Sequence, residues 1–147
     1  MGNEGEGVDM LLKSNSNQRK KRKKLTKQEA ELLIPKQSRW IDSEAIEAVE
    51  HCNNGMCECC NGARTNCAHH ISTRGAGGAD IVQNLLGVCW VCHTLVHAAN
   101  IPLIRQKEIV SQRNQRLANN PRWCELLDRG MEAIKKGKAR GNRWAVT

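Results

Sequence analysis

The chain has 147 residues and a formal net charge of +8, and only 3% of its residues are aromatic, all of them Trp. This length suits one modest domain with appendages and excludes two independent cores. A chain so poor in large apolar side chains has a small core, which usually needs disulfide bonds or a structural metal for stability.

The positive charge is concentrated towards the two ends of the chain. Residues 1–34 carry 8 − 5 = +3, residues 35–100 carry 4 − 6 = −2, and residues 101–147 carry 11 − 4 = +7. Two basic flanks around a near-neutral centre suit a polyanionic partner, although basic tails also occur on proteins that only stay soluble. The N-terminus lacks the apolar stretch of a secretory signal, and no segment approaches membrane-spanning length. We therefore expect a cytoplasmic protein with reduced thiols and no membrane partner.

Residues 1–40 are expected to form a flexible basic arm with a short helix. Residues 1–18 are rich in Gly, Asn and Ser and favour disorder. The capping-box spacing that begins at Thr26 predicts a short helix, which Pro35 ends. Between the two lies a block of like charges that repel one another and are expected to contact phosphate: Arg19, Lys20, Lys21, Arg22, Lys23 and Lys24.

Residues 41–100 are expected to form the core. A helix is predicted to begin near Asp42 or Ser43, with Ile46 and Val49 on one face. From residue 55 to residue 87 the sequence is short, Gly-punctuated pieces, which indicate loops and brief strands. A further helix is expected from Cys89 to His97.

Residues 101–147 predict basic C-terminal helices and a tail. Asn100 and Pro102 open one helix, and Asn120 and Pro121 open a second. From Gly137 onward we expect a loose basic tail. The apolar positions of the first helix are Ile104, Ile109, Val110 and Leu117, and those of the second are Trp123, Leu126, Leu127, Met131 and Ile134.

Two C-x-x-C pairs predict a structural zinc site. Four thiolates from two such turns make a closed tetrahedral site: Cys57, Cys60, Cys89 and Cys92. A redox pair or incidental buried cysteines would leave unexplained why the two pairs bracket a His-rich segment. Cys59 lies inside the first pair and competes with it at poorer spacing. The other cysteines are interpreted as small packing residues: Cys52, Cys67 and Cys124.

Four of the five histidines lie between the C-x-x-C pairs or just after them. Neighbouring side chains on a strand point in opposite directions, so His69 and His70 can serve different purposes. His93 and His97 are four residues apart, on one face of a helix. A strand with one ligand against a helix with one or two more would build an open metal site, whereas the lone His51 is interpreted as a satisfied residue.

The run from Cys57-Glu-Cys-Cys60 through Ala68-His-His-Ile71 and Asn84-Leu to Cys89-Trp-Val-Cys92-His93 resembles the zinc-containing branch of the HNH endonuclease family. The resemblance covers residues 55–97. It implies an α+β fold with a small ββα-metal core held by a four-cysteine zinc site, flanked by helices and the disordered arm. Gly75, Gly77 and Gly78 fit a tight turn between its two strands.

The resemblance also implies a metal-dependent hydrolysis of DNA phosphodiester bonds. His70 would be the general base, and Asn84 would hydrogen-bond backbone to hold the loop that carries it. His69 and His93 would hold a catalytic divalent metal, Mg²⁺, Mn²⁺, Ni²⁺ or Zn²⁺. Many members have Asp where this chain has His69; those with His add a further ligand at the spacing of His97, which otherwise is a plain surface residue.

Several alternatives remain open at the level of sequence. Arg74 is either a phosphate contact or a solvated loop cation. A non-catalytic zinc finger that binds nucleic acid explains the cysteines and the charge equally well, but not the histidines and Asn84 together. A structural or accessory protein that retains an HNH fold is a third alternative, because small HNH proteins often act with larger partners. Double-stranded DNA is the favoured partner by family habit. A larger phage or DNA-processing partner, a homodimer, and a bacterial host cytoplasm fit a phage-type protein of this family.

Overall fold

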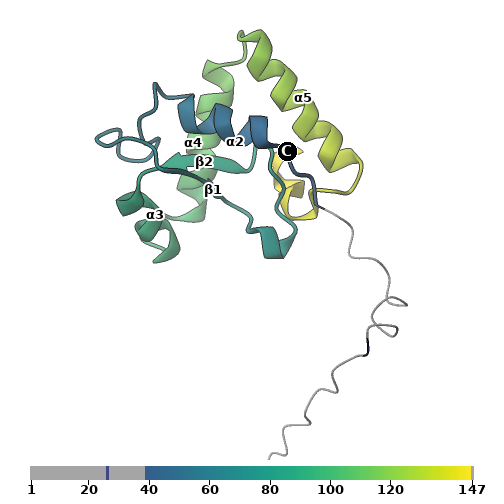
Figure 1. Cartoon of the computed structure of the whole chain (residues 1–147), viewed down its shortest axis with the longest axis horizontal. Coiled ribbons are helices and arrows are strands. Elements are labelled where there is room, and N and C mark those ends of the chain that lie inside the picture. The colour runs from purple at the N-terminus through teal and green to yellow at the C-terminus, as the bar shows by residue number, and fades with distance from the viewer. Residues whose placement is uncertain (1–25, 27–38, 147) are drawn as a thin grey trace, which may run out of the picture. The chain divides into compact units, whose positions relative to one another are not determined.

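A computed structural model describes residue 26 and residues 39–146 of the chain. In this part, helices surround a two-stranded antiparallel sheet (Figure 1), which confirms the mixed α+β class. The basic block at 19–24 and the short helix expected after Thr26 lie outside the described residues. The elements in chain order are α2 (Ser43–His51), β1 (Cys67–His70), the 3₁₀ helix η1 (Arg74–Ala76), β2 (Leu85–Val88), α3 (Trp90–His97), α4 (Leu103–Arg116), α5 (Pro121–Lys135) and the 3₁₀ helix η2 (Arg140–Val146).

The helices begin where their capping residues predict. The Asp42 side chain accepts a hydrogen bond from the Ala45 N–H at 3.2 Å, and that of Asn120 accepts one from the Trp123 N–H at 3.1 Å. Each satisfies a backbone donor that the first turn of a helix leaves free. At α3 the cap is the Cys89 sulfur, which accepts from the Cys92 N–H at 3.4 Å.

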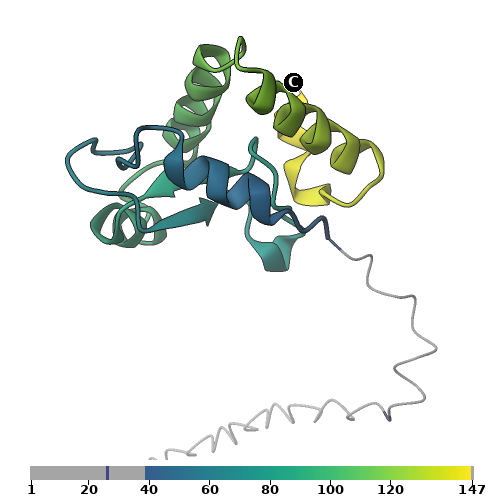
Figure 2. The ribbon, with the colours of Figure 1, turned by 45° about the horizontal axis from the view of Figure 1, so that its top comes forward.

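Strand β2 is buried on both faces because helices cover each side of the sheet, whereas β1 is only partly buried. His69 pairs with Leu86 and His70 pairs with Leu85. Leu85 packs in one cluster with residues of α2 and α5, such as Val49 and Trp123, and Figure 2 shows α2 lying over the two strands. Leu86 points the other way, into a cluster with Val110 of α4 and the cysteines. The alternation of side chains along β2 therefore connects two apolar clusters.

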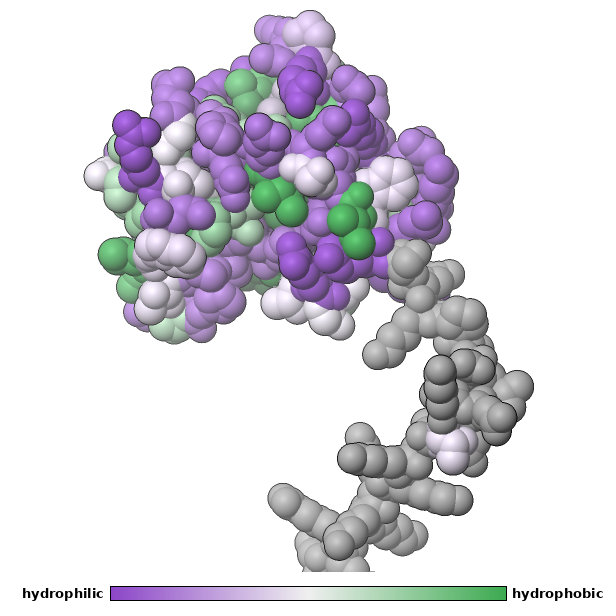
Figure 3. Space-filling view, viewed as in Figure 1, coloured by the Kyte–Doolittle hydropathy of each residue, from purple (hydrophilic) through white to green (hydrophobic). Residues whose placement is uncertain are grey.

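The described elements belong to one compact unit, Lys36–Thr147, which includes the expected core and the C-terminal helices together. Polar side chains cover most of the face seen in Figure 3. No helix in the described part of the chain is long and apolar enough to cross a membrane.

The expectation of a loose tail from Gly137 is wrong. Ala139 is 1% exposed and Asn142 is fully buried, and the Ala79 N–H donates a hydrogen bond of 3.1 Å to the Asn142 side-chain oxygen. Trp144 donates to the Ser72 hydroxyl at 3.3 Å. A basic composition predicted solvation, but these contacts with the loop between β1 and β2 hold η2 in place.

The predicted apolar face of α4 is partly wrong. Ile104 is 66% exposed, and Ile109 is only half-buried. The buried face consists of Gln106, Val110 and Arg113. An apolar pattern does not predict Arg113 on this face. The arginine can be buried there because its charge is compensated.

Arg113 and Glu58 form a buried ion pair that connects α4 to the first C-x-x-C turn. Their charged atoms are 2.9 Å apart, and their side chains are 1% and 3% exposed. Arg113 also donates to the carbonyls of Leu85, at 2.9 Å, and Val82. The Glu58 carboxylate also accepts a hydrogen bond from the Gly87 N–H, 2.7 Å away. One guanidinium therefore satisfies backbone groups that precede and begin β2.

We predict that Arg113→Ala lowers the free energy of unfolding by about 3–5 kcal/mol, because it leaves the Glu58 charge buried and unpaired. Urea denaturation followed by circular dichroism measures the change. Arg113→Met combined with Glu58→Gln recovers part of the loss. The control is Arg105→Ala on the same helix: Arg105 pairs with Glu108 at the surface, where both side chains are more than half exposed, and its removal changes stability by less than about 0.5 kcal/mol. Equal effects of the two substitutions would contradict the assignment.

Candidate functional site

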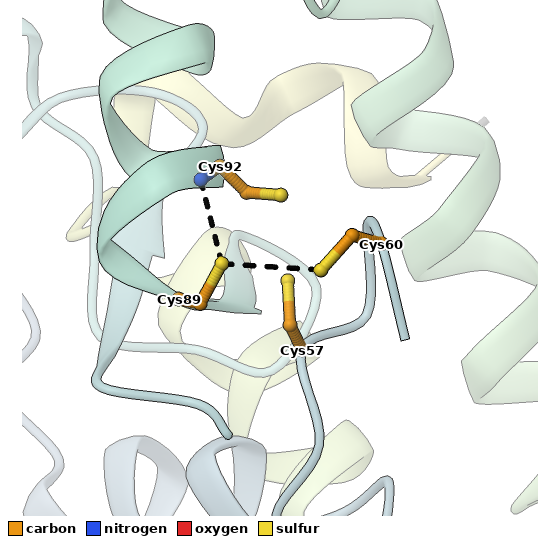
Figure 4. Close-up of side chains that lie close together, drawn as sticks. All are labelled: Cys57, Cys60, Cys89 and Cys92. Atoms are coloured by element: carbon orange, nitrogen blue, oxygen red, sulfur yellow. Dashed lines mark hydrogen bonds between the residues drawn. The ribbon is translucent and has the colours of Figure 1, made fainter. Parts of the chain in front are cut away.

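The four cysteines of the two C-x-x-C pairs come together at one point. Cys57 and Cys60 lie on the turn before β1, and Cys89 and Cys92 lie at the start of α3. Figure 4 shows their sulfurs pointing toward one another. All four sulfurs lie within 4.8 Å of one another, and those of Cys60 and Cys89 are 3.9 Å apart.

This cluster can hold a metal ion such as zinc. Tetrahedral coordination with Zn–S bonds of about 2.3 Å places the sulfurs about 3.8 Å apart, close to the separation seen. Burial and hydrogen bonds among the neighbouring thiols raise the pKa of Cys92 above its ordinary value. The Cys92 thiol therefore keeps its proton without a metal, and a bound cation would displace that proton.

The remaining cysteine of the first turn, Cys59, is not part of this cluster. Its side chain is half-buried against the apolar cluster that contains Leu86 and Val88. Burial, with the nearby Cys57 and Glu58, raises the pKa of its thiol to about 12. Its contacts agree with a packing role.

A second cluster consists of His69 from β1 and of His93 and His97 from α3. One ring nitrogen of each lies within 4.8 Å of the others. The Nε2 atoms of His93 and His97 are 3.1 Å apart, which suits two ligands of one ion, since metal–nitrogen bonds of about 2.1 Å place ligand nitrogens about 3.0–3.4 Å apart. The His69 ring centroid lies 5.3 Å from that of His93 and 5.1 Å from that of His97.

Burial and neighbouring rings favour the neutral imidazole at two of these histidines, His69 and His93. Burial, together with the neighbouring His93 and His97, lowers the pKa of His69 to about 4. Burial and His97 also lower the pKa of His93. Neutral rings offer the lone pairs that a metal needs, so near pH 7 His69 and His93 can bind a divalent cation without first losing protons.

His70 points away from the cluster toward a buried carboxylate. Its Nε2 lies 2.7 Å from Oδ1 of Asp80, whose side chain is 2% exposed. The guanidinium of Arg39 contacts the same oxygen at 2.8 Å. Burial raises the pKa of Asp80, but the hydrogen bond from His70 and the Arg39 charge outweigh it and hold that pKa below its ordinary value. Asp80 is therefore an ionised group inside the protein.

Asn84 organises the loop that follows His70. It is fully buried, and its side-chain oxygen accepts from the Ser72 N–H at 2.7 Å. Its amide donates to the carbonyls of Ser72, at 3.1 Å, and Ala79, at 3.0 Å. These contacts agree with the predicted role of holding the loop through backbone hydrogen bonds.

The loop between β1 and β2, residues 71–84, is longer than the tight turn expected from its glycines. Gly77 has a φ of 86°, a left-handed conformation that favours glycine. A Cβ on Gly78 would lie 1.7 Å from the Ser72 carbonyl oxygen. Both glycines let the loop fold back on itself. Arg74, at its tip, is 56% exposed and lies 4.0 Å from Asp80.

Four of the five histidines border one open cavity: His69, His70, His93 and His97. Its volume is about 330 Å³, and Arg74 and Gly75 also line it. Three histidines that could hold a metal ion, a further imidazole and an exposed arginine therefore line the same space. Such a space can hold a cation, a water molecule and an anionic group together. Comparisons with family models, with curated proteins and with solved structures found no match for this chain.

Sequence reasoning missed Asp80 and Arg39. Each is an ordinary charged residue without a motif around it, and they are 41 positions apart. The only sequence signal for Asp80 is that it stands as an isolated acid beside the apolar run that leads to Asn84. The predicted DNA-contacting block, Arg19–Lys24, lies outside the described residues.

We predict that Cys60→Ser abolishes stoichiometric zinc binding and that Cys59→Ser does not. Zinc content of the purified chain, measured by atomic emission, gives the first readout, and circular dichroism gives the second. Since zinc sites of this type contribute ~10–16 kcal/mol in peptides, the Cys60 variant is expected to lose folded structure. A Cys59→Ser protein that loses zinc to the same extent would reverse the ligand assignment.

We predict that His97 is a ligand of a second cation. Replacing residues that merely support ligands lowers metal affinity about 10–100-fold, so His97→Ala should cost at least as much. The measurement is calorimetric titration of the zinc-loaded chain with Ni²⁺. His51→Ala is the matched control, because His51 is exposed and bonds the Glu47 carbonyl of its own helix at 2.8 Å. If the His97 variant binds Ni²⁺ with wild-type affinity, His97 is a surface residue and not a ligand.

Proposed function

We propose that this protein is a metal-dependent endonuclease of the HNH type that hydrolyses phosphodiester bonds in DNA. The observation that carries the proposal is the shared cavity. This cavity is lined both by His70 and by three histidines whose nitrogens can meet around one cation. A zinc finger without catalytic activity has no need of this arrangement.

The order of the elements supports the same proposal. β1 carries His69 and His70, β2 follows, and α3 carries His93 and His97. This is the strand–strand–helix order of the ββα-metal core that the sequence resemblance implies. In that scheme zinc at the four cysteines stabilises the core and takes no part in the reaction.

In the proposed reaction, His70 takes a proton from a water molecule in the cavity while the water oxygen bonds to phosphorus. The bond from phosphorus to the 3′ oxygen breaks, and that oxygen gains a proton from solvent. The products have 5′-phosphate and 3′-hydroxyl ends. A divalent cation held by His69, His93 and His97 would supply charge neutralisation at the phosphate. A set of three imidazoles favours a transition metal over Mg²⁺.

Charge supports DNA as the substrate class. Residues 101–147 carry a net +7, and Arg74 is more than half exposed on the cavity wall. Exposed cations bind the phosphate backbone mainly by releasing counterions, with little regard to base sequence. We propose that Arg74 contacts a phosphate beside the scissile one.

We predict that the zinc-loaded protein nicks supercoiled plasmid when Mn²⁺, Ni²⁺ or Mg²⁺ is added. His70→Ala should slow nicking by about 10²–10⁴-fold, the usual contribution of a general base. Gel electrophoresis of the plasmid over time gives the rates. His51→Ala, which also removes one imidazole, is expected to nick at the wild-type rate.

The same experiment separates the competing function. A non-catalytic zinc finger would bind plasmid in a gel-shift assay and leave it uncut with every metal. Binding without cutting by the wild-type protein would overturn the proposal of hydrolysis. Nicking that survives in His70→Ala would show a contaminating nuclease or a different base.

A further inference from the structure

Asp80 is a buried, ionised carboxylate that contacts the proposed base, yet the proposed reaction gives it no role. It is a carboxylate with a 2% exposed side chain in a loop, and its two oxygens have separate sets of partners. Oδ1 contacts Arg39 and His70 at 2.8 and 2.7 Å. Oδ2 accepts from the Asp42 N–H at 3.4 Å. Arg74 lies 4.0 Å away. Every one of these groups stabilises a negative charge.

In the hydrogen bond between His70 and Asp80, the imidazole must therefore be the donor and the carboxylate the acceptor. An ionised carboxylate has no proton to donate, so the bond of 2.7 Å requires a hydrogen on Nε2 of His70. A neutral imidazole carries one ring hydrogen. With that hydrogen on Nε2, the lone pair is on Nδ1, the ring nitrogen that does not contact Asp80.

We infer that Asp80 is a positioning residue that holds His70 in the tautomer with hydrogen on Nε2 and thereby makes Nδ1 the proton acceptor. Arg39 has a supporting part, because its guanidinium on the same oxygen keeps the carboxylate in place. The Asp80 backbone adds a second restraint, since its N–H donates to the Trp40 carbonyl at 3.1 Å. Residues 39–42, before α2, thus define the orientation of a side chain on β1.

The inference deepens the proposed function and rests on it for its catalytic consequence, whereas the tautomer itself is a property of the folded chain. A ring held by Asp80 cannot rotate freely, so its acceptor nitrogen keeps one position relative to His69 and the metal ligands. Without Asp80 the ring would sample both tautomers and several orientations. Only a fraction of molecules would then present an acceptor to water, which lowers kcat and leaves substrate binding intact.

The direct test is the tautomer of His70 in the zinc-loaded full chain. Long-range proton–nitrogen NMR correlation of the ¹⁵N-labelled protein at mildly alkaline pH distinguishes the two neutral forms, and His70→Gln assigns the signal by removing it. We expect the form with hydrogen on Nε2 in the wild type, and a mixture of forms in Asp80→Ala. A wild-type signal from the form with hydrogen on Nδ1 would overturn the inference, whether or not the protein cuts DNA.

The kinetic test uses plasmid nicking with Mn²⁺. Asp80→Asn keeps the shape of the side chain but removes its charge, and its amide offers N–H as readily as oxygen. We expect kcat to fall by about 10²-fold or more, with KM within about twofold of wild type and Ni²⁺ affinity at the histidine cluster unchanged. The control is Asp128→Asn, which makes the same charge change at an exposed position of α5.

The outcomes separate the two proposals. A wild-type kcat in both Asp80 variants, with the protein folded and zinc-loaded, would overturn the positioning role. A wild-type protein that never nicks DNA but has the expected tautomer would overturn the proposed function and retain the Asp80–His70 contact. If Asp80→Ala fails to fold, the wild-type spectrum and Asp80→Asn still decide the question.

Discussion

The convergence of four thiols is the constraint on which the rest of this structure depends. It joins the turn at residues 57–60 to the first turn of α3. α3 has eight residues, of which only Cys92 and Val96 are buried, while Trp90 and Val91 are 62% and 69% exposed. So short a helix with so little apolar burial is not stable by itself. A metal at the thiols would hold it against β2, and the place of His93 and His97 follows from that.

Buried polar side chains hold together segments of this protein that apolar contacts would hold together in a larger core. Asn84, Asp80 and Asn142 each hold a segment through hydrogen bonds, and each is at most 1% exposed. Such groups are costly to bury unless they are paired, and their pairing then allows only one arrangement of the loop. In this protein the loop so arranged is the one that runs from His70 to Asn84. The polar interior therefore serves the candidate site directly.

Strand geometry gives the adjacent histidines His69 and His70 different surroundings. Side chains alternate along β1, so His69 meets the histidines of α3 while His70 meets Asp80. The proposed ligand and the proposed base are adjacent residues, which keeps their separation nearly constant when the rest of the chain moves. A helix would place neighbouring side chains about 100° apart and would not separate them as fully.

Local features of the sequence determined a large part of what is seen. The C-x-x-C spacing predicted which thiols converge, since each turn alone brings two sulfurs together. The i, i+4 spacing placed His93 and His97 on one face, and Asp42 and Asn120 marked the starts of their helices. Each of these relations spans a few residues, so backbone geometry alone decides it.

Tertiary structure alone decided the contacts between distant residues. The partners of Asp80, the Arg113–Glu58 pair across 55 positions and the docking of residues 139–144 on the β1–β2 loop have no local signature. A charged or polar residue carries the same signal in the sequence whether water or a buried partner satisfies it. Only the folded chain brings the partner close enough, and excludes enough water, to make burial favourable.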